Sequence, residues 1–269
     1  GSSSFDSQST DTQTLRLALA REFQLLATLQ HPHIIRVLDY GFDAQAQPFF
    51  TMDLLTEAQT IIHYGTERPF EVKLCLIGEL ILALIYLHRR GIIHRDLKPT
   101  NVMVVSNNVK VLDFGLSMEA DQPTAKDNAS GTLAYMAPEM FRQGNVVPAS
   151  DQYAVGVIAY QLLVGRHPFN TNDLSHFLHD TMNVMPTMDH PELTPPLQHI
   201  LTKLLAKQPD QRFADLNESL EAINQITGKP LVQETVAIRE SFLQAARFVG
   251  RQTEMEILEA RLKQTGQGL

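Results

Sequence analysis

The sequence predicts a mixed α+β protein in which a small part with one helix and two strands is followed by a larger, mainly helical part. Apolar residues recur at helical spacing over residues 15–29, and two runs rich in β-branched and aromatic residues follow at 34–43 and 48–55. From residue 149 onward the apolar pattern is helical. Strands and helices do not alternate and no segment repeats, which argues against a parallel sheet or a repeat protein.

The first elements follow directly from these patterns. The helix over 15–29 ends near Pro32, which breaks the helical pattern. The two strands after it are joined by a turn that contains Gly41 and Asp43. A long apolar helix is expected over 70–89.

The middle of the chain is expected to contain strands beside a polar loop, and the rest is expected to be helical. The stretches 92–105 and 108–116 each predict a short strand, and residues 116–135 are too polar to predict an element. The chain turns helical after Pro138. Further helices are expected over residues 149–165, 172–182, 196–207, 213–226 and 251–263.

The composition excludes several classes of protein. With 43% hydrophobic and 19% charged residues, the chain is expected to be soluble and globular. A net charge of −8 argues against binding to nucleic acid or to acidic membranes. The apolar stretch around Cys75 is too short to span a membrane and carries Glu79. A single cysteine fits the reducing cytoplasm, where we expect the protein, and Cys75 is expected to be buried.

The stretch IIHRDLKPTNVMVV (92–105) concentrates polar groups between two apolar runs. Phosphoryl transfer needs a carboxylate to orient the attacking hydroxyl, oxygen ligands for magnesium, and positive charge near the migrating phosphoryl group. Asp96 can supply the first and Lys98 the last, while Asn101 offers a neutral oxygen to Mg²⁺. Asp113, in VLDFGL, offers a charged ligand. These residues predict a phosphotransferase site.

Three motifs in order carry a resemblance to a known family. HRDLKPTN (94–101), DFG (113–115) and APE (137–139) resemble the catalytic loop, the metal-binding loop and the end of the activation segment of eukaryotic-type (Hanks-type) serine/threonine protein kinases, in the form found in bacteria. The resemblance extends over roughly residues 15–226. It implies a protein-kinase-like, two-lobed α+β fold. The small lobe would be incomplete, with helix αC and the last strands only, and the large lobe mainly helical.

The resemblance also implies the reaction and its residues. ATP would be the phosphate donor, Mg²⁺ the cofactor, and a protein serine or threonine hydroxyl the acceptor. Asp96 and Lys98 are the implied catalytic residues, and Asn101 and Asp113 the implied metal ligands. The residues implied to form the ATP pocket are Glu22 of helix αC, Met52, Asp53 and Leu55 of the hinge, and Met103.

Other matching positions have structural roles in the family. Asp151 matches the aspartate that holds the backbone of the catalytic loop. Arg212 matches the arginine that pairs with the glutamate of the APE motif, here Glu139. His94 matches a residue of the regulatory spine rather than a catalytic base. The implied spine residues are Leu26, Val37, His94 and Phe114.

The resemblance also suggests how the enzyme is regulated. Thr132 in GTLAYMAPE fits the serine/threonine type and is expected to be structural. Arg95, directly before Asp96, implies control by phosphorylation of the activation segment, because a buried arginine needs an anionic partner. Thr124 and Ser130 are the expected phosphorylation sites.

The family also has a glycine-rich loop over the phosphates and a strand lysine that pairs with the glutamate of helix αC. The first glycine after Gly1 is Gly41 and the first lysine is Lys73, both beyond the expected αC. We therefore expect an N-terminally truncated kinase that transfers phosphate poorly by itself. Because every catalytic-loop position is intact, truncation explains the sequence better than a natural pseudokinase does.

The C-terminal segment suggests a second domain. RFVGRQTEMEILEARLK (247–263) resembles the start of AAA- or STAND-type ATPase domains, although an ordinary amphipathic helix explains the same pattern. The chain ends before a phosphate-binding loop could appear. The expected organisation is a flexible segment 1–14, a partial small lobe with hinge 15–54, a large lobe 55–226, a linker 227–246, and the start of a following domain 247–269.

Two other functions compete with protein phosphorylation. A non-catalytic kinase-fold module that binds regulatory partners is the main alternative, but it does not require the intact Asp96 and Asp113. A small-molecule phosphotransferase would lack the APE segment. His176 and His179 share a helix face, but with no third ligand nearby in the sequence they indicate a solvated surface rather than a metal site.

Overall fold

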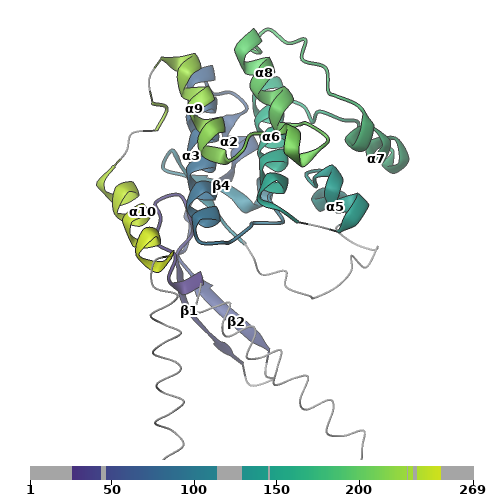
Figure 1. Cartoon of the computed structure of the whole chain (residues 1–269). Helices are drawn as coiled ribbons and strands as arrows, with labels where there is room; N and C mark the ends of the chain where they lie inside the picture. The colour runs from purple at the N-terminus through teal and green to yellow at the C-terminus, as the bar shows by residue number, and fades with distance from the viewer. Residues whose placement is uncertain are drawn as a thin grey trace, which may run out of the picture.

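The computed structural model describes residues 26–43, 47–113, 129–144, 146–228, 230–232 and 235–249. A helical body contains most of these residues, and a two-stranded hairpin extends from one end of it (Figure 1). This arrangement confirms the predicted α+β class, with a small strand-containing part before a larger helical part.

The hairpin consists of β1 (Val37–Phe42) and β2 (Pro48–Met52), which pair antiparallel. Gly41 lies opposite Phe49 inside the ladder, so the prediction that it belongs to the turn was wrong. Asp43 does lie beyond the strands. Of the helix expected over 15–29, only the last residues are described, and the helical conformation there ends after Ala27.

Helices α3 (Phe70–Arg89) and α6 (Pro148–Val164) form the centre of the helical body. Side chains are buried on nearly all faces of both helices, as their continuous apolar sequences predict. α8 (Pro195–Leu204) packs closely on α6 at Gly156, where an added Cβ would lie 2.9 Å from the Cβ of Leu204. The absence of a side chain at this glycine therefore sets the distance between the two helices.

A three-stranded antiparallel sheet lies beside α3. It contains β3 (Gln59–Thr60), β4 (Val102–Val105) and β5 (Asn108–Val111) in that order. Ser106 and Asn107, both with positive φ, form the tight turn between β4 and β5. The stretch 92–105 thus supplies one strand after its polar loop and none before it.

Several short elements were not predicted. The segment expected to lack structure contains α4 (Ala129–Leu133), and β3 is followed by α2 (Ile61–Gly65).

The predicted helical character after Pro138 is confirmed by α5 (Pro138–Gln143). The remaining elements are α7 (Leu174–Asn183), α9 (Leu216–Thr227) and the 3₁₀ turns Pro99–Asn101 and Pro209–Gln211.

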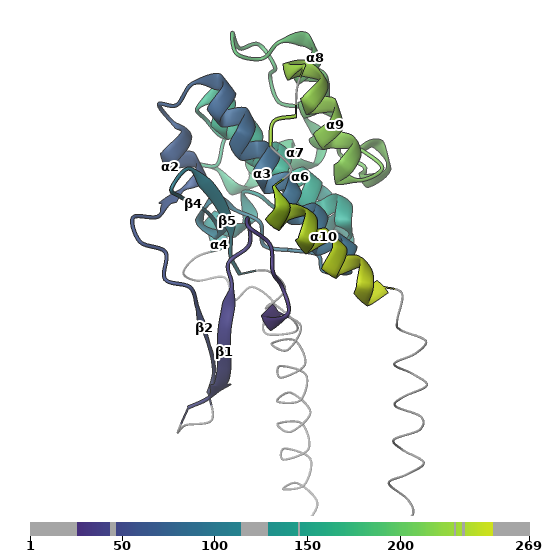
Figure 2. The same cartoon turned by 90° about the vertical axis from the view of Figure 1, so that its left-hand side faces the viewer.

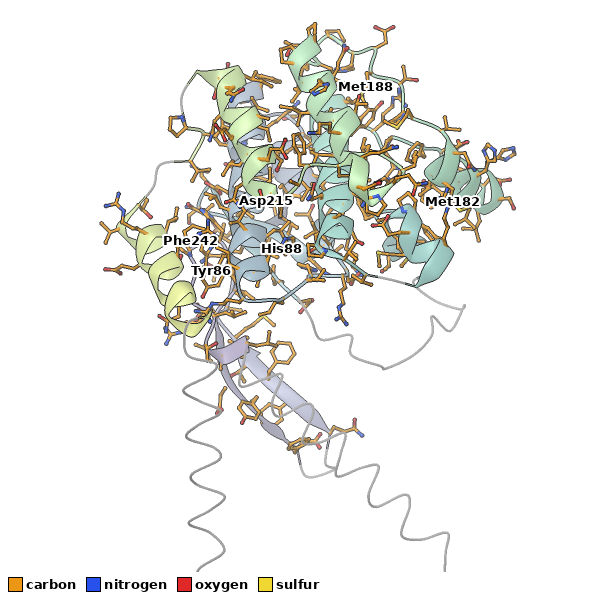
Figure 3. The ribbon with its side chains drawn as sticks, in the orientation of Figure 1. Tyr86, His88, Met182, Met188, Asp215 and Phe242 are labelled. Carbon is orange, nitrogen blue, oxygen red and sulfur yellow. The ribbon has the colours of Figure 1, made fainter. Side chains whose placement is uncertain are left out.

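A further helix, α10 (Val236–Val249), occupies most of the segment that the sequence predicted to be a linker. It packs against α3 (Figure 2). The ring centroid of Phe242 lies 6.2 Å from that of Tyr86 and 5.8 Å from that of His31, and the labelled residues Phe242 and Tyr86 are neighbours in Figure 3. Burial lowers the pKa of His31 to about 3, so its ring is neutral in this aromatic cluster.

The chain leading into α10 also packs on α3. A Cβ added at Gly78 would lie 3.2 Å from Val232, and the Sγ of Cys75 donates to the carbonyl of Leu231 at 3.4 Å. Cys75 is half-buried rather than fully buried as expected. The helix expected over 251–263 lies outside the described residues. Within the described part, none of the helices has the length and apolar character needed to cross a membrane.

We expect Gly156→Ala to lower the free energy of unfolding by about 1–3 kcal/mol, because the new methyl group would collide with Leu204 close to its backbone. Urea unfolding followed by circular dichroism measures this change. Gly131→Ala in α4 is the control, since its Cβ would meet nothing within 4 Å. Equal stability of the two variants would contradict the packing argument.

Candidate active site

The polar loop between α3 and β4 is held by one carboxylate from α6. Asp151 is 2% exposed, and its Oδ2 accepts the backbone N–H of His94 at 2.9 Å while its Oδ1 accepts that of Arg95 at 3.1 Å. Nε2 of His88 lies 2.7 Å from the same Oδ2. Arg95 has a φ of +70°, an unfavourable conformation for a non-glycine residue that these bonds hold in place. The expected role of Asp151 is confirmed.

His94 is completely buried, and its Nε2 donates to the carbonyl oxygen of Leu112 at 3.0 Å. Burial lowers the pKa of His94 despite the nearby carboxylates of Asp151 and Asp96. A neutral, buried imidazole bonded to backbone supports the structural role expected from the sequence. Leu26 and Val37 of the implied spine are also buried, and Phe114 lies outside the described residues.

Asp96, Lys98 and Asn101 converge in the loop between α3 and β4, which ends in the 3₁₀ turn Pro99–Asn101. The Nζ of Lys98 donates to Oδ2 of Asp96 at 2.7 Å and to Oγ1 of Thr132 at 2.8 Å. The Nδ2 of Asn101 donates to the carbonyl of Asp96 at 2.9 Å and to its Oδ2 at 3.2 Å. The carboxylate of Asp96 is 31% exposed, so it is oriented by two donors and still open to an incoming group.

Asn101 and Asp113 fit a magnesium site of the kind completed by substrate phosphates. The amide nitrogen of Asn101 is used toward Asp96, which orients its oxygen as the atom available to a hard cation. The backbone N–H of Leu112 donates to the carbonyl of Asn101 at 2.9 Å. This bond holds the segment with Asp113, the next residue in the chain, beside Asn101, and Asp113 is exposed. Within the described residues no cluster of three His, Cys, Asp or Glu could hold a metal by itself. Oxygen ligands of this kind are those that Mg²⁺ prefers, together with water and substrate phosphates.

Of the residues predicted to contact ATP, two lie on strands of different sheets and two lie in the segment that follows β2. Met52 ends β2 and, like Leu55, packs partly buried against the core. Asp53 is exposed, and its backbone N–H donates to the carbonyl of Arg36 at 3.0 Å. Met103 lies in β4, opposite Thr60 of β3 and Lys110 of β5. Glu22 falls outside the described residues.

Arg95 differs from its predicted environment. It is exposed rather than buried, and no described residue forms an ion pair with its guanidinium. Together with Asp96, Thr132 and Tyr135 it lines a small cavity beside the loop. The side chains of Thr124 and Ser130 lie outside what the structure describes.

Glu139 and Arg212 form a buried, bidentate ion pair, as predicted. Both Arg212–Glu139 bonds are short, at 2.8 Å to Oε1 and 2.7 Å to Oε2, and Ser150 donates to Oε1 at 2.7 Å. Burial acts to raise the pKa of Glu139, but the hydrogen bonds and charge of Arg212 outweigh it and hold the pKa below its usual value. The pair joins the start of α5 to the region before α9.

Sequence reasoning missed two contacts of the site. It did not predict that His88 would bond to Asp151, or that Thr132 would accept a hydrogen bond from Lys98. These partners are 63 and 34 positions apart, so no local pattern joins them. Only the chain fold brings them together.

Comparison with known proteins identifies the family of this chain. The family described as "Protein kinase domain" matches residues 5–229, and the chain belongs to this family. Its likeness to serine/threonine-protein kinase Pkn1 of Myxococcus xanthus is 36% identity over 207 residues, covering 72% of this chain and 30% of that protein.

Two further relatives show the same pattern. PknB of Mycobacterium leprae is 33% identical over 211 residues, covering 73% of this chain and 34% of that protein. PknL of Mycobacterium tuberculosis (strain H37Rv) is 29% identical over 262 residues, covering 91% of this chain and 62% of that protein. The chain therefore spans about a third of the length of Pkn1 and PknB.

We expect Arg212→Leu to lower the free energy of unfolding by about 3–5 kcal/mol at pH 7.5, because Glu139 would remain buried without its partner. The pKa of Glu139 would then rise above its unfolded value. A carboxyl with a raised pKa in the folded state destabilises the fold only at pH values where the same carboxyl is ionised in the unfolded state. The loss should therefore shrink as the pH falls to about 5, and urea unfolding at both pH values measures it. A deficit that is the same at both pH values would contradict this account.

Proposed function

We propose that the chain is the catalytic part of a serine/threonine protein kinase that transfers the γ-phosphate of ATP to protein hydroxyls. The observation that carries the proposal is the position of Lys98, whose Nζ bonds both to Asp96 and to Thr132. This geometry places a carboxylate, a positive charge and the segment before the APE motif at one point. The curated relatives named serine/threonine-protein kinases support the acceptor class.

Each residue has a role in the proposed transfer. The oxygen of a serine or threonine hydroxyl attacks the γ-phosphorus, the bond from that phosphorus to the bridging oxygen of ADP breaks, and ADP leaves. Asp96 orients the hydroxyl and accepts its proton. Lys98 offsets the negative charge of the γ-phosphoryl oxygens. Its bond to Oδ2 of Asp96 also orients the carboxylate.

Asn101 and Asp113 would hold magnesium, which when bound neutralises the phosphate charge. Asn101 also fixes Asp96 through its amide nitrogen, so metal binding and base orientation share one side chain. The adenine is proposed to contact Met52, Asp53, Leu55 and Met103, with Glu22 in the pocket. These assignments rest on the family motifs and on the positions of the described residues.

The wider setting is proposed from the sequence. A single cysteine favours the cytoplasm, and the segment 247–263 favours an ATPase domain after the kinase domain in the whole protein. The partners would be a protein substrate and ATP. The domain boundaries at 14, 54, 226 and 246 stay predictions.

We expect Asp96→Asn to reduce transfer from labelled ATP to a serine-rich protein substrate by about 100-fold or more, because general-base catalysis and hydroxyl orientation are lost together. The product of the complete coding region is assayed beside this chain. Asp189→Asn, an exposed aspartate far from the loop in sequence, is the matched control and should retain full activity. If the unsubstituted protein never exceeds the Asp96→Asn background, the fold serves as a non-catalytic binding module instead.

We further expect active protein to carry phosphate on Thr124 or Ser130, as the family resemblance implies, because such a phosphate would give the exposed guanidinium of Arg95 an anionic partner. Phosphopeptide mapping tests the modification. Arg95→Gln should remove most of the gain in activity that phosphorylation produces and leave the unphosphorylated activity unchanged. Fully active protein without phosphate on either residue would refute this mode of control.

A further inference from the structure

His167, in the loop between α6 and α7, contacts two backbone segments at once. Its Nε2 lies 2.9 Å from the carbonyl oxygen of Ala134, 33 positions earlier in the chain. Its Nδ1 receives the backbone N–H of Phe169 at 3.1 Å. The ring is partly buried, and it meets Tyr135 edge-on at 5.7 Å between centroids. Neither the motifs nor the proposed reaction gives this histidine a role.

The contacts indicate the tautomer of His167. The carbonyl oxygen of Ala134 can only accept, whereas Nδ1 also has an N–H group within reach, so we assign the ring proton to Nε2. Nδ1 lies 3.1 Å from the N–H of Phe169 and 2.9 Å from the carbonyl oxygen of the same residue. Burial lowers the pKa of His167, although the two carbonyls act in the opposite direction, so the ring carries one proton. With that proton on Nε2, Nδ1 accepts the N–H of Phe169, and a neutral imidazole links the α6–α7 loop to residue 134.

The segment that His167 holds borders the catalytic carboxylate. At one end, Thr132 accepts the hydrogen bond from Lys98. One residue beyond Ala134, the hydroxyl of Tyr135 donates to Oε1 of Gln161 in α6 at 2.7 Å. Thr132, Tyr135 and Met136 line the cavity that also contains Asp96. The His167 bond is the middle one of three side-chain anchors that fix residues 132–136.

The geometry points to His167 as a positioning residue for protein-substrate binding: its Nε2–H fixes the carbonyl of Ala134 and so holds residues 132–136 against α6 beside Asp96. This inference rests on the proposed kinase function. The proposed ATP contacts lie on β2 and β4 and in the hinge, not on this segment. Loss of the anchor should therefore weaken binding of the protein substrate and leave ATP binding unchanged.

Two substitutions separate the bond to Ala134 from the bond to Phe169. Asn has its polar atoms near the position of Nδ1, so His167→Asn can still accept from the N–H of Phe169 but is too short to reach Ala134. The amide nitrogen of Gln extends to about the position of Nε2, so His167→Gln can still donate to Ala134. His176→Asn, on the exposed surface of α7, controls for the chemical change itself.

We expect His167→Asn to raise the KM for a protein substrate about tenfold, the effect of one lost buried hydrogen bond, with the KM for ATP within about twofold of the unsubstituted protein. His167→Gln and His176→Asn should restore or keep the original KM for the protein substrate. Equal values for the Asn and Gln variants at position 167 would overturn the assignment, as would an equal rise in both KM values.

Backbone hydrogen exchange tests the anchor independently of catalysis. The amides of Tyr135 and Met136 bond to the carbonyls of Thr132 and Leu133, so their protection reports on this turn. His167→Asn should speed their exchange about tenfold, while His167→Gln and amides in α9 stay protected. If the unsubstituted protein does not transfer phosphate, the proposed function fails. The exchange rates then still test whether His167 fixes residues 132–136. Unchanged exchange in His167→Asn would overturn it.

Discussion

The carboxylate of Asp151 is the interaction on which the site depends. It lies in the buried helix α6, and it accepts the backbone N–H groups of His94 and Arg95, which lie outside any helix or strand. Hydrogen bonds to a charged group contribute about 1.5–3 kcal/mol each, enough to hold Arg95 at a positive φ. The geometry of Asp96 and Lys98 therefore follows from the position of a core helix.

The same helix organises the segment on the far side of the site. Gln161 of α6 accepts the hydroxyl of Tyr135, and Ser150 at its first turn donates to Glu139, which is paired with Arg212. The loop with Asp96 and the segment with Thr132 are thus fixed to one rigid element. The bond from Lys98 to Thr132 closes the connection between them. A helix with no catalytic residue of its own sets the distances in the site.

A second connection runs through the sheet. The backbone of Ile35 donates to Val111 at 3.0 Å, and Leu112, the next residue, bonds to Asn101 and His94. The loop that begins this path contains His31, whose ring lies in the aromatic cluster covered by Phe242 of α10. Helix α10, which follows the residues matched by the family, therefore packs on the loop with His31. A few hydrogen bonds connect that loop to the catalytic loop.

The sequence by itself determined the α+β class, the long apolar helices over 70–89 and 149–165, and the identity of the candidate site residues, because periodicity and motif spacing are local properties of the chain. It also assigned Asp151 and the Glu139–Arg212 pair through a family resemblance. Only the tertiary structure decided that α10 packs on α3, that Arg95 is exposed, and that His167 reaches Ala134. Those outcomes depend on contacts between residues tens or hundreds of positions apart, and no local pattern records which surfaces will meet.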